Sequence, residues 1–206
     1  MSNLRIALVF ADAIIQPDQR PALIAINTAT FLAVLCWVFL ATFLVTRFTA
    51  TWREWFADIF GSKVYFLAWL VPTVAMFFSL YFSEYLGWSP CKLCWIQRGF
   101  IYSLAVLMLF NYFRPNTIIR YFGYALAGIC PFVSAYHVNV EIRGEETSFC
   151  SAAVSCATIW FKTLGFLTIP GMALTASVTV FVLLLMIGRY EKQSKSDQTN
   201  GHSIDS

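Results

Sequence analysis

Two cysteines three positions apart, Cys91 and Cys94, are the residues whose spacing most directly predicts chemistry. They lie in the stretch PCKLCWIQR at residues 90–98, between two almost wholly apolar segments at residues 64–83 and 99–113. A Cys-x-x-Cys pair can exchange disulfides, provide half of a zinc site, or form a short structural crosslink. Because segments suited to lipid flank the pair, its chemistry is expected at a membrane surface.

The residues around the pair favour disulfide exchange. Pro90 precedes the first cysteine and helps to set the start of a helix, whose free amide groups and partial positive charge favour thiolate over thiol. Lys92 and Arg98 add positive charge nearby. A Cys-x-x-Cys disulfide closes a very short loop and constrains the unfolded chain little, so stability alone is a weak reason for the pair.

The composition predicts that membrane helices position this pair. Of 206 residues, 59% are hydrophobic and 12% are charged, whereas about a quarter of a soluble domain is charged. Uncharged runs at residues 22–46, 64–83, 121–140 and 163–188 each reach the roughly 20 residues that span a bilayer as a helix. A fifth run, 99–113, becomes long enough if its helix begins at Leu93 and includes Arg98. We therefore predict an all-α integral membrane protein with five spans.

These spans divide the chain into four parts. Residues 1–21 form an expected interfacial segment, and residues 22–48 an extra N-terminal transmembrane helix for which the sequence gives no role. Residues 63–188 contain the other four spans, with cysteine-bearing loops at 84–93 and 139–162. Residues 189–206 are predicted to be a polar cytoplasmic tail without regular structure.

Basic residues predict which helix ends face the cytoplasm, because Lys and Arg accumulate in cytoplasmic loops. Eight fall on one side, namely Arg47, Arg53, Lys63, Arg114, Arg120, Arg189, Lys192 and Lys195, against six on the other. The eight-charge side is predicted to be cytoplasmic. The C-terminus would then lie inside, and the loops that carry the cysteines outside.

A second cysteine pair, Cys150 and Cys156, lies two helices after the first, so both pairs are expected on the same membrane face. If that face lies outside the cytoplasm, the four cysteines occupy an oxidising compartment, in which disulfides persist. Two dithiols on one face favour an electron relay over a shared four-cysteine zinc site, whose spacing would be irregular, and we expect no metal. Cys36 and Cys130 fall inside apolar runs and are interpreted as small buried hydrophobes.

A dithiol at the membrane surface needs an electron acceptor, and a quinone is the lipid-soluble acceptor of two electrons. Arg98, one turn into the apolar run, could donate hydrogen bonds to a quinone carbonyl. The alternative interpretation is that the Arg98 side chain extends along the helix so that its guanidinium reaches the lipid headgroups and binds no ligand. Gln97 is interpreted as facing a neighbouring helix.

The stretch PCKLCWIQR, the later cysteine pair and the segment GFLTIP at residues 165–170 resemble the DsbB/BdbC family of quinone-dependent disulfide bond formation membrane proteins. The resemblance is nearer to the BdbC-like branch. In the vitamin K epoxide reductase family the order of the two cysteine pairs is reversed, so that family fits less well.

The resemblance implies a DsbB-like four-helix bundle in a bacterial cytoplasmic (inner) membrane, with its cysteine loops on the periplasmic side. It implies that Cys150 exchanges with a DsbA-like thioredoxin-fold partner and that Cys156 exchanges with Cys91. Cys94 would pass the electrons to ubiquinone or menaquinone. The protein would thereby support disulfide bond formation in secreted proteins.

The resemblance also assigns roles around the quinone, with Arg98 beside it and His137 assisting nearby. The family usually has a glutamine four residues beyond that histidine, where this chain has Glu141. The second cysteine pair is only six positions apart and could itself form a disulfide. An alternative function remains open, namely a non-enzymatic membrane scaffold or assembly factor whose disulfides only hold its loops.

Overall fold

The computed structural model of the chain describes residues 20–47, 63–144, 150 and 154–202. Within these residues, five helices are long and apolar enough to cross a membrane, as predicted. They are α2 (Arg20–Arg47), α4 (Lys63–Leu80, followed by the π-helix η1, Tyr81–Tyr85), α5 (Lys92–Phe113), α6 (Thr117–Arg143) and α7 (Ile169–His202). The predicted all-α class is confirmed, since the described part of the chain adds only an isolated bridge between Thr163 and Leu167.

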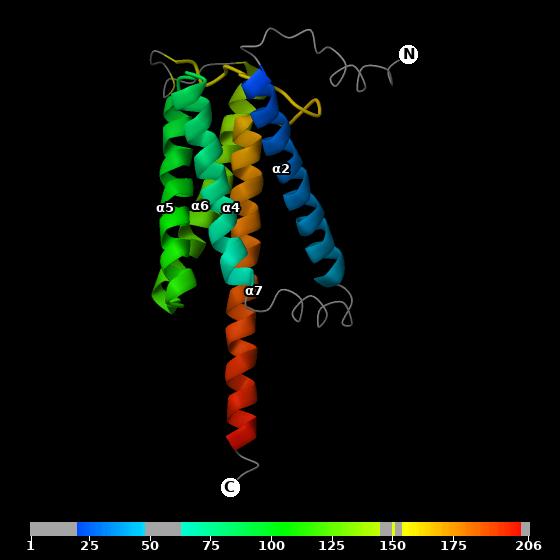
Figure 1. The fold of residues 1–206 in the computed structure, drawn as a ribbon, viewed down its shortest axis with the longest axis vertical. Coiled ribbons are helices and arrows are strands. Elements are labelled where there is room, and N and C mark those ends of the chain that lie inside the picture. Colours follow the sequence, from blue (N-terminus) through cyan, green and yellow to red (C-terminus); the bar gives the residue numbers. More distant parts are fainter. Residues whose placement is uncertain (1–19, 48–62, 145–149, 151–153, 203–206) are drawn as a thin grey trace.

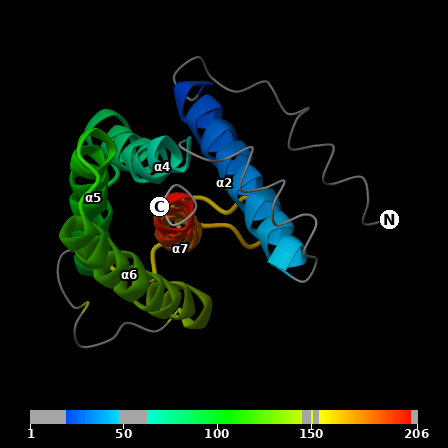
Figure 2. The same ribbon diagram turned by 90° about the horizontal axis from the view of Figure 1, so that it is seen from below.

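Helix α7 occupies the centre of the arrangement. Seen along the helices, α4, α5 and α6 form an arc on one side of α7, and α2 lies on its other side (Figure 2). Helix α7 packs against α6, α4 and α2. The N-terminal end of α5 and the C-terminal end of α6 lie at the same end of the bundle as the start of α2 (Figure 1). This end carries both cysteine pairs.

Local sequence signals set the ends of the helices that carry the site. Cys91 is the N-cap of α5, and its sulfur accepts the backbone N–H of Cys94. Asn116 caps α6 in the same way through Ile118. Helix α6 ends at Gly144, whose φ of 65° is the left-handed conformation that glycine adopts most readily.

The packed core lies between the four bundle helices. Its fully buried side chains include Leu104 and Met108 on α5, Ala127 on α6, and Leu183 and Leu184 on α7. At the end away from the cysteines, Glu191 on α7 pairs with Arg120 on α6 and accepts a hydrogen bond from Tyr65 on α4 at 2.7 Å. These polar contacts join α7 to two neighbouring helices.

The outer face of the bundle is apolar, as lipid requires. Large hydrophobic side chains such as Phe132, Ile142 and Phe113 are mostly exposed. A soluble monomer rarely exposes apolar surface on this scale. The exposed surface and the five spans therefore agree that the protein is a multi-pass membrane protein.

One expectation was wrong. The polar tail was predicted to lack regular structure, but α7 continues through it to His202 and extends beyond the other helices (Figure 1). The stretch from Arg189 to Asn200 contains no glycine or proline, so nothing in it interrupts the helix. The predicted interfacial segment at residues 1–21 lies, apart from its last two residues, outside the described residues.

Candidate functional site

The first turn of α5 brings the two sulfur atoms of the Cys-x-x-Cys pair together. Cys91 Sγ and Cys94 Sγ lie 3.1 Å apart and are not bonded to each other. Cys91 is buried, and its sulfur also accepts the backbone N–H of Cys94 at 3.3 Å. A disulfide between the two requires only a small movement. The pair is therefore arranged as a dithiol that can open and close.

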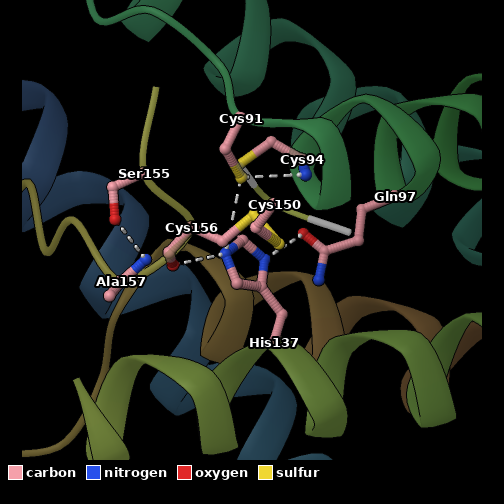
Figure 3. The surroundings of a disulfide bond; sticks show 8 residues. All are labelled: Cys91, Cys94, Gln97, His137, Cys150, Ser155, Cys156 and Ala157. Atoms are coloured by element: carbon pink, nitrogen blue, oxygen red, sulfur yellow. Dashed lines mark hydrogen bonds between the residues drawn. A yellow bond between two sulfur atoms is a disulfide. The ribbon is translucent and has the colours of Figure 1, made fainter. Parts of the chain in front are cut away.

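The second pair forms a disulfide, Cys150–Cys156, directly beside the first (Figure 3). Both of its cysteines are fully buried, and they belong to the same packed cluster as Cys91 and Val140. The structure thus brings together the four cysteines selected from the sequence. Because both cysteines are buried, another protein can reach Cys150 only if the groups that cover it move.

His137 on α6 contacts a residue of each pair. Its Nε2 is 3.6 Å from Cys91 Sγ and 3.2 Å from the Cys156 carbonyl oxygen, and its Nδ1 is 3.4 Å from Gln97 Oε1 (Figure 3). Gln97 donates an amide N–H to Ser134 Oγ at 3.2 Å, which turns its carbonyl oxygen toward His137. Both ring nitrogens therefore face groups that can accept.

The same surroundings favour the thiolate of Cys91. Hydrogen bonding with the Cys94 side chain, helped by His137 and by the Cys94 backbone N–H, lowers the pKa of Cys91 to about 4 against the opposing effect of burial. A thiolate is both the nucleophile and the better leaving group in disulfide exchange. The surroundings of Cys91 therefore favour the form of the thiol that takes part in disulfide exchange.

Arg98 lies one turn further along α5 and is half-buried. Its guanidinium donates to the Ser79 carbonyl oxygen at 3.0 Å, at the end of α4 where the π-helix follows, and lies 5.2 Å from the centre of the Trp95 ring. A guanidinium carries five N–H donors. The bond to Ser79 can therefore fix the group while other donors serve a ligand.

A cavity of about 460 Å³ lies on the other side of the dithiol. Cys94, Gln97 and Arg98 line its polar end, and most of its remaining lining is apolar. Neither Cys91 nor His137 is among the residues that line it. Cys91 therefore lies toward the second disulfide and Cys94 toward the cavity. The cavity suits a mainly apolar ligand with hydrogen-bond acceptors at one end.

The dithiol also has the donors of a partial metal site. The ligand atoms of Cys91, Cys94 and His137 all lie within 4.8 Å of one another. Two thiolates and an imidazole are ligands that zinc accepts, and a fourth would complete a tetrahedron. Cys150 and Cys156 are bonded to each other and are not among these three ligands.

Several polar residues around the site were not selected from the sequence. Ser134 lies one turn before His137 on α6, a spacing that places both on one helix face. Glu141, one turn after His137, is buried and accepts a hydrogen bond from Thr168 Oγ1 at 2.6 Å. The spacing of these α6 residues was a usable signal. Thr168 belongs to the GFLTIP segment at residues 165–170, but nothing in that segment predicts its contact with Glu141.

The fold and the site together define a membrane protein that holds two cysteine pairs in position for thiol–disulfide exchange. The family model described as "Disulfide bond formation protein DsbB" matches residues 61–187. The chain belongs to the DsbB family, and the resemblance seen in the sequence is confirmed. The matched region contains α4, α5, α6 and most of α7, together with all four site cysteines.

Curated relatives agree with this assignment. A probable disulfide formation protein of Oceanobacillus iheyensis is 35% identical over 132 residues, which are 63% of this chain and 91% of the relative. A probable disulfide formation protein C of Halalkalibacterium halodurans is 34% identical over 124 residues, 59% of this chain and 90% of the relative. Disulfide bond formation protein C of Bacillus subtilis is 31% identical over 130 residues, which are 61% of this chain and 94% of the relative. No solved structure matches the chain at a significant level.

Proposed function

We propose that the protein is a quinone-dependent thiol–disulfide oxidoreductase that reoxidises a DsbA-like extracytoplasmic dithiol protein. One observation carries the proposal: the dithiol of α5 stands between a second disulfide and an apolar cavity, with one sulfur toward each. This order suits a relay in which electrons pass from a soluble protein to a lipid-soluble acceptor. The net reaction converts a reduced partner and a quinone into an oxidised partner and a quinol.

Two exchanges precede the transfer to the acceptor. A thiolate of the partner attacks Cys150 and releases Cys156, and the second thiol of the partner then resolves this mixed disulfide. The freed Cys156 attacks Cys91 in the oxidised Cys91–Cys94 pair, and Cys150 closes the second disulfide again. Cys91 and Cys94 then hold the two electrons, which is the distribution of bonds in the structure.

The surroundings of Cys91 support its part in this sequence. A stabilised thiolate makes Cys91 a good leaving group when Cys150 attacks Cys156 in the Cys91–Cys156 mixed disulfide. His137, in contact with Cys91 and with the Cys156 backbone, keeps the two pairs close and offers positive charge to the departing sulfur. His137 therefore acts at the exchange step in this proposal.

The lining of the cavity fits a quinone. Arg98 and Gln97 supply N–H donors at the end where Cys94 lies, and the rest of the wall suits an isoprenoid chain. When bound, the quinone accepts two electrons and two protons. Arg98 would orient its carbonyl oxygen and stabilise negative charge that develops there, while the Trp95 ring and Ser79 keep the guanidinium in place.

A trapping experiment tests the partner exchange. In Cys156→Ser, Cys150 keeps a free thiol that should attack the disulfide of an oxidised DsbA-like protein, release one thiol of that protein and remain attached as a mixed disulfide, because Cys156 is missing and cannot take Cys150 back. Non-reducing electrophoresis and mass spectrometry of the adduct would identify the linked cysteines. Cys130→Ser removes a buried cysteine outside the site and should give no adduct.

Quinone reduction distinguishes the proposal from a structural scaffold. The purified full-length protein, given a reduced DsbA-like protein and ubiquinone or menaquinone, should consume both in equal amounts. A scaffold whose disulfides only hold its loops would consume neither and would give no trapped adduct. That result would remove the enzymatic proposal.

A further inference from the structure

Helix α2 lies outside the matched family region, yet it contributes to the wall of the cavity. The family match begins at residue 61, whereas α2 ends at Arg47. The α2 residues in the lining are Ala29, Leu32, Ala33, Leu35, Cys36 and Phe39. A helix additional to the family bundle therefore shapes the chamber in which Cys94 lies.

Small side chains and two hydrogen bonds hold α2 against the bundle. Three buried alanines recur at every fourth position of the helix: Ala25, Ala29 and Ala33. Such a face allows close approach between helices in a membrane. Thr30 Oγ1 donates to Thr163 Oγ1 at 3.0 Å, and Trp37 Nε1 donates to Thr175 Oγ1 at 2.8 Å. These hydrogen bonds join α2 to Thr163, which directly follows the cysteine-bearing loop at 139–162, and to α7.

The cavity is elongated along the helices, with its polar end near the cysteine pairs and its apolar part further along the bundle. Its polar end, at Arg98, lies near the start of α5. Phe39 on α2 and Leu183 on α7 also line it, well along helices that begin at the cysteine end (Figure 1). The cavity therefore extends from the dithiol toward the middle of the membrane. Trp88 and Trp160, stacked with ring centres 5.5 Å apart, line it at the cysteine end.

We propose that α2 forms the wall of a channel for the isoprenoid chain of the quinone and so determines which chains the protein accepts. The inference rests on the proposed function and adds the element that recognises the tail. A volume of about 460 Å³ exceeds what a single ring needs and falls within the roughly 300–1,000 Å³ of pockets that bury drug-sized ligands. The apolar α2 face matches an isoprenoid chain, and Arg98 matches the carbonyl oxygens of the ring.

A matched pair of substitutions on α2 tests this channel. Ala33→Phe fills the cavity from the α2 side and should raise the KM for a long-chain ubiquinone about tenfold or more. Disulfide exchange with the reduced partner protein should be unchanged, and a short-chain ubiquinone should be affected less. Ala41→Phe makes the same change at an exposed alanine of α2 outside the cavity and should alter neither step.

Cys36 offers a binding measurement that needs no turnover. It is half-buried and lines the cavity, whereas Cys130 is fully buried and does not. In the full-length protein with both site pairs oxidised, alkylation of Cys36 by N-ethylmaleimide is followed by mass spectrometry. A long-chain ubiquinone should slow this alkylation more than a short-chain one, and Cys130 should be unaffected by either.

The outcomes separate this inference from the proposed function. If the wild-type protein reduces ubiquinone but chain length does not change Cys36 protection, the role of α2 is wrong and the proposed function stands. If the wild-type protein reduces no quinone, the proposed function fails and this inference fails with it. Should Ala33→Phe not fold, the Cys36 measurement on the wild-type protein decides alone.

Discussion

At the scale of single residues, the chemistry depends on the balance of effects at Cys91. Burial disfavours its charged form, whereas the Cys94 side chain, His137 and the N-terminal end of α5 favour it. The favourable contacts lower the pKa of Cys91 more than burial raises it, so this pKa lies far below that of an ordinary thiol. Each favourable contact comes from a position that the fold fixes, so each can be removed separately.

The first prediction concerns pH. In the reduced protein, the rate at which iodoacetamide modifies Cys91 should change little from about pH 8 to about pH 5, because a pKa of about 4 keeps the thiolate populated. It should fall only as the pH drops through that value. An ordinary thiol, with a pKa of about 8.5, loses roughly tenfold in rate per pH unit over this range. Mass spectrometry of the Cys91 peptide measures the rate.

Variants of His137 isolate its share of this effect. His137→Ala removes charge and hydrogen bond, so the pKa of Cys91 should rise and the rate at about pH 5 should fall roughly tenfold or more. His137→Gln retains a neutral hydrogen-bond donor, so its rate of Cys91 modification at about pH 5 should lie between those of the wild-type protein and His137→Ala. If the rate of Cys91 modification in the wild-type protein already falls tenfold for each pH unit below about pH 8, the Cys91 thiolate is not stabilised.

The second prediction concerns Arg98. Arg98→Ala should reduce the rate of quinone reduction by on the order of a hundredfold, with little change in the rate of exchange with the partner protein. Arg98→Lys should recover part of the loss, because it restores charge without the planar set of donors. Arg143→Ala removes an exposed arginine on the same membrane side and serves as the control. Equal losses in both steps would exclude a role specific to the quinone.

The sequence predicts part of this site directly. The spacing of Cys91 and Cys94 and the charge of Arg98 inside an apolar run are local signals, and the structure brings those residues together. The contact of His137 with Cys91 is not local, since it depends on how α6 is rotated against α5. The resemblance implies that His137 lies near a quinone, which stays a prediction, while in the structure its Nε2 contacts Cys91 Sγ and the Cys156 carbonyl oxygen.

At the scale of elements, one face of α6 supports both the site and the packing. Its buried residues recur every three or four positions: Gly123, Ala127, Cys130, Ser134, His137 and Glu141. Small residues on this face permit close helix packing, and the polar ones gather at the cysteine end. The helix therefore positions His137 through contacts several turns away from it.

The third prediction tests that packing. A Cβ added at Gly123 would lie 2.7 Å from Met108 Cε and 3.2 Å from Leu184 Cδ1, so a larger side chain has to displace both neighbours. Gly123→Leu should destabilise the protein by about 1–3 kcal/mol and lower its unfolding temperature in detergent. Gly128→Leu, where the nearest atom is Phe181 Cε2 at 3.7 Å, should cost less. Equal losses would show that close packing at Gly123 is unimportant.

At the scale of the whole molecule, the number of spans is predictable and their arrangement is not. Length and apolarity predict five helices, because a bilayer sets the length of each span. Residues that face lipid and residues that face the core are equally apolar, so the sequence does not reveal that α7 lies at the centre. For the same reason, the position of α2 against α7 became visible only in the structure.

The fourth prediction concerns orientation. Thr158 and Thr117 are both exposed, at the cysteine end and at the opposite end of the bundle respectively. With all six native cysteines replaced by alanine, an impermeant maleimide added to intact cells should label Thr158→Cys and spare Thr117→Cys. Permeabilised cells should label both variants. The reverse pattern in intact cells would place the cysteine pairs in the cytoplasm, where reducing conditions oppose their proposed chemistry.

The burial of the Cys150–Cys156 bond also affects which reductants can use it. The rate of thiol attack depends on access to sulfur, and neither cysteine is exposed. A small reductant such as glutathione therefore meets a shielded bond, whereas a protein that binds there and displaces the groups covering the sulfur atoms can reach it. In the proposed function, this shielding would reserve oxidising capacity for a protein that docks and would limit its loss to free small thiols.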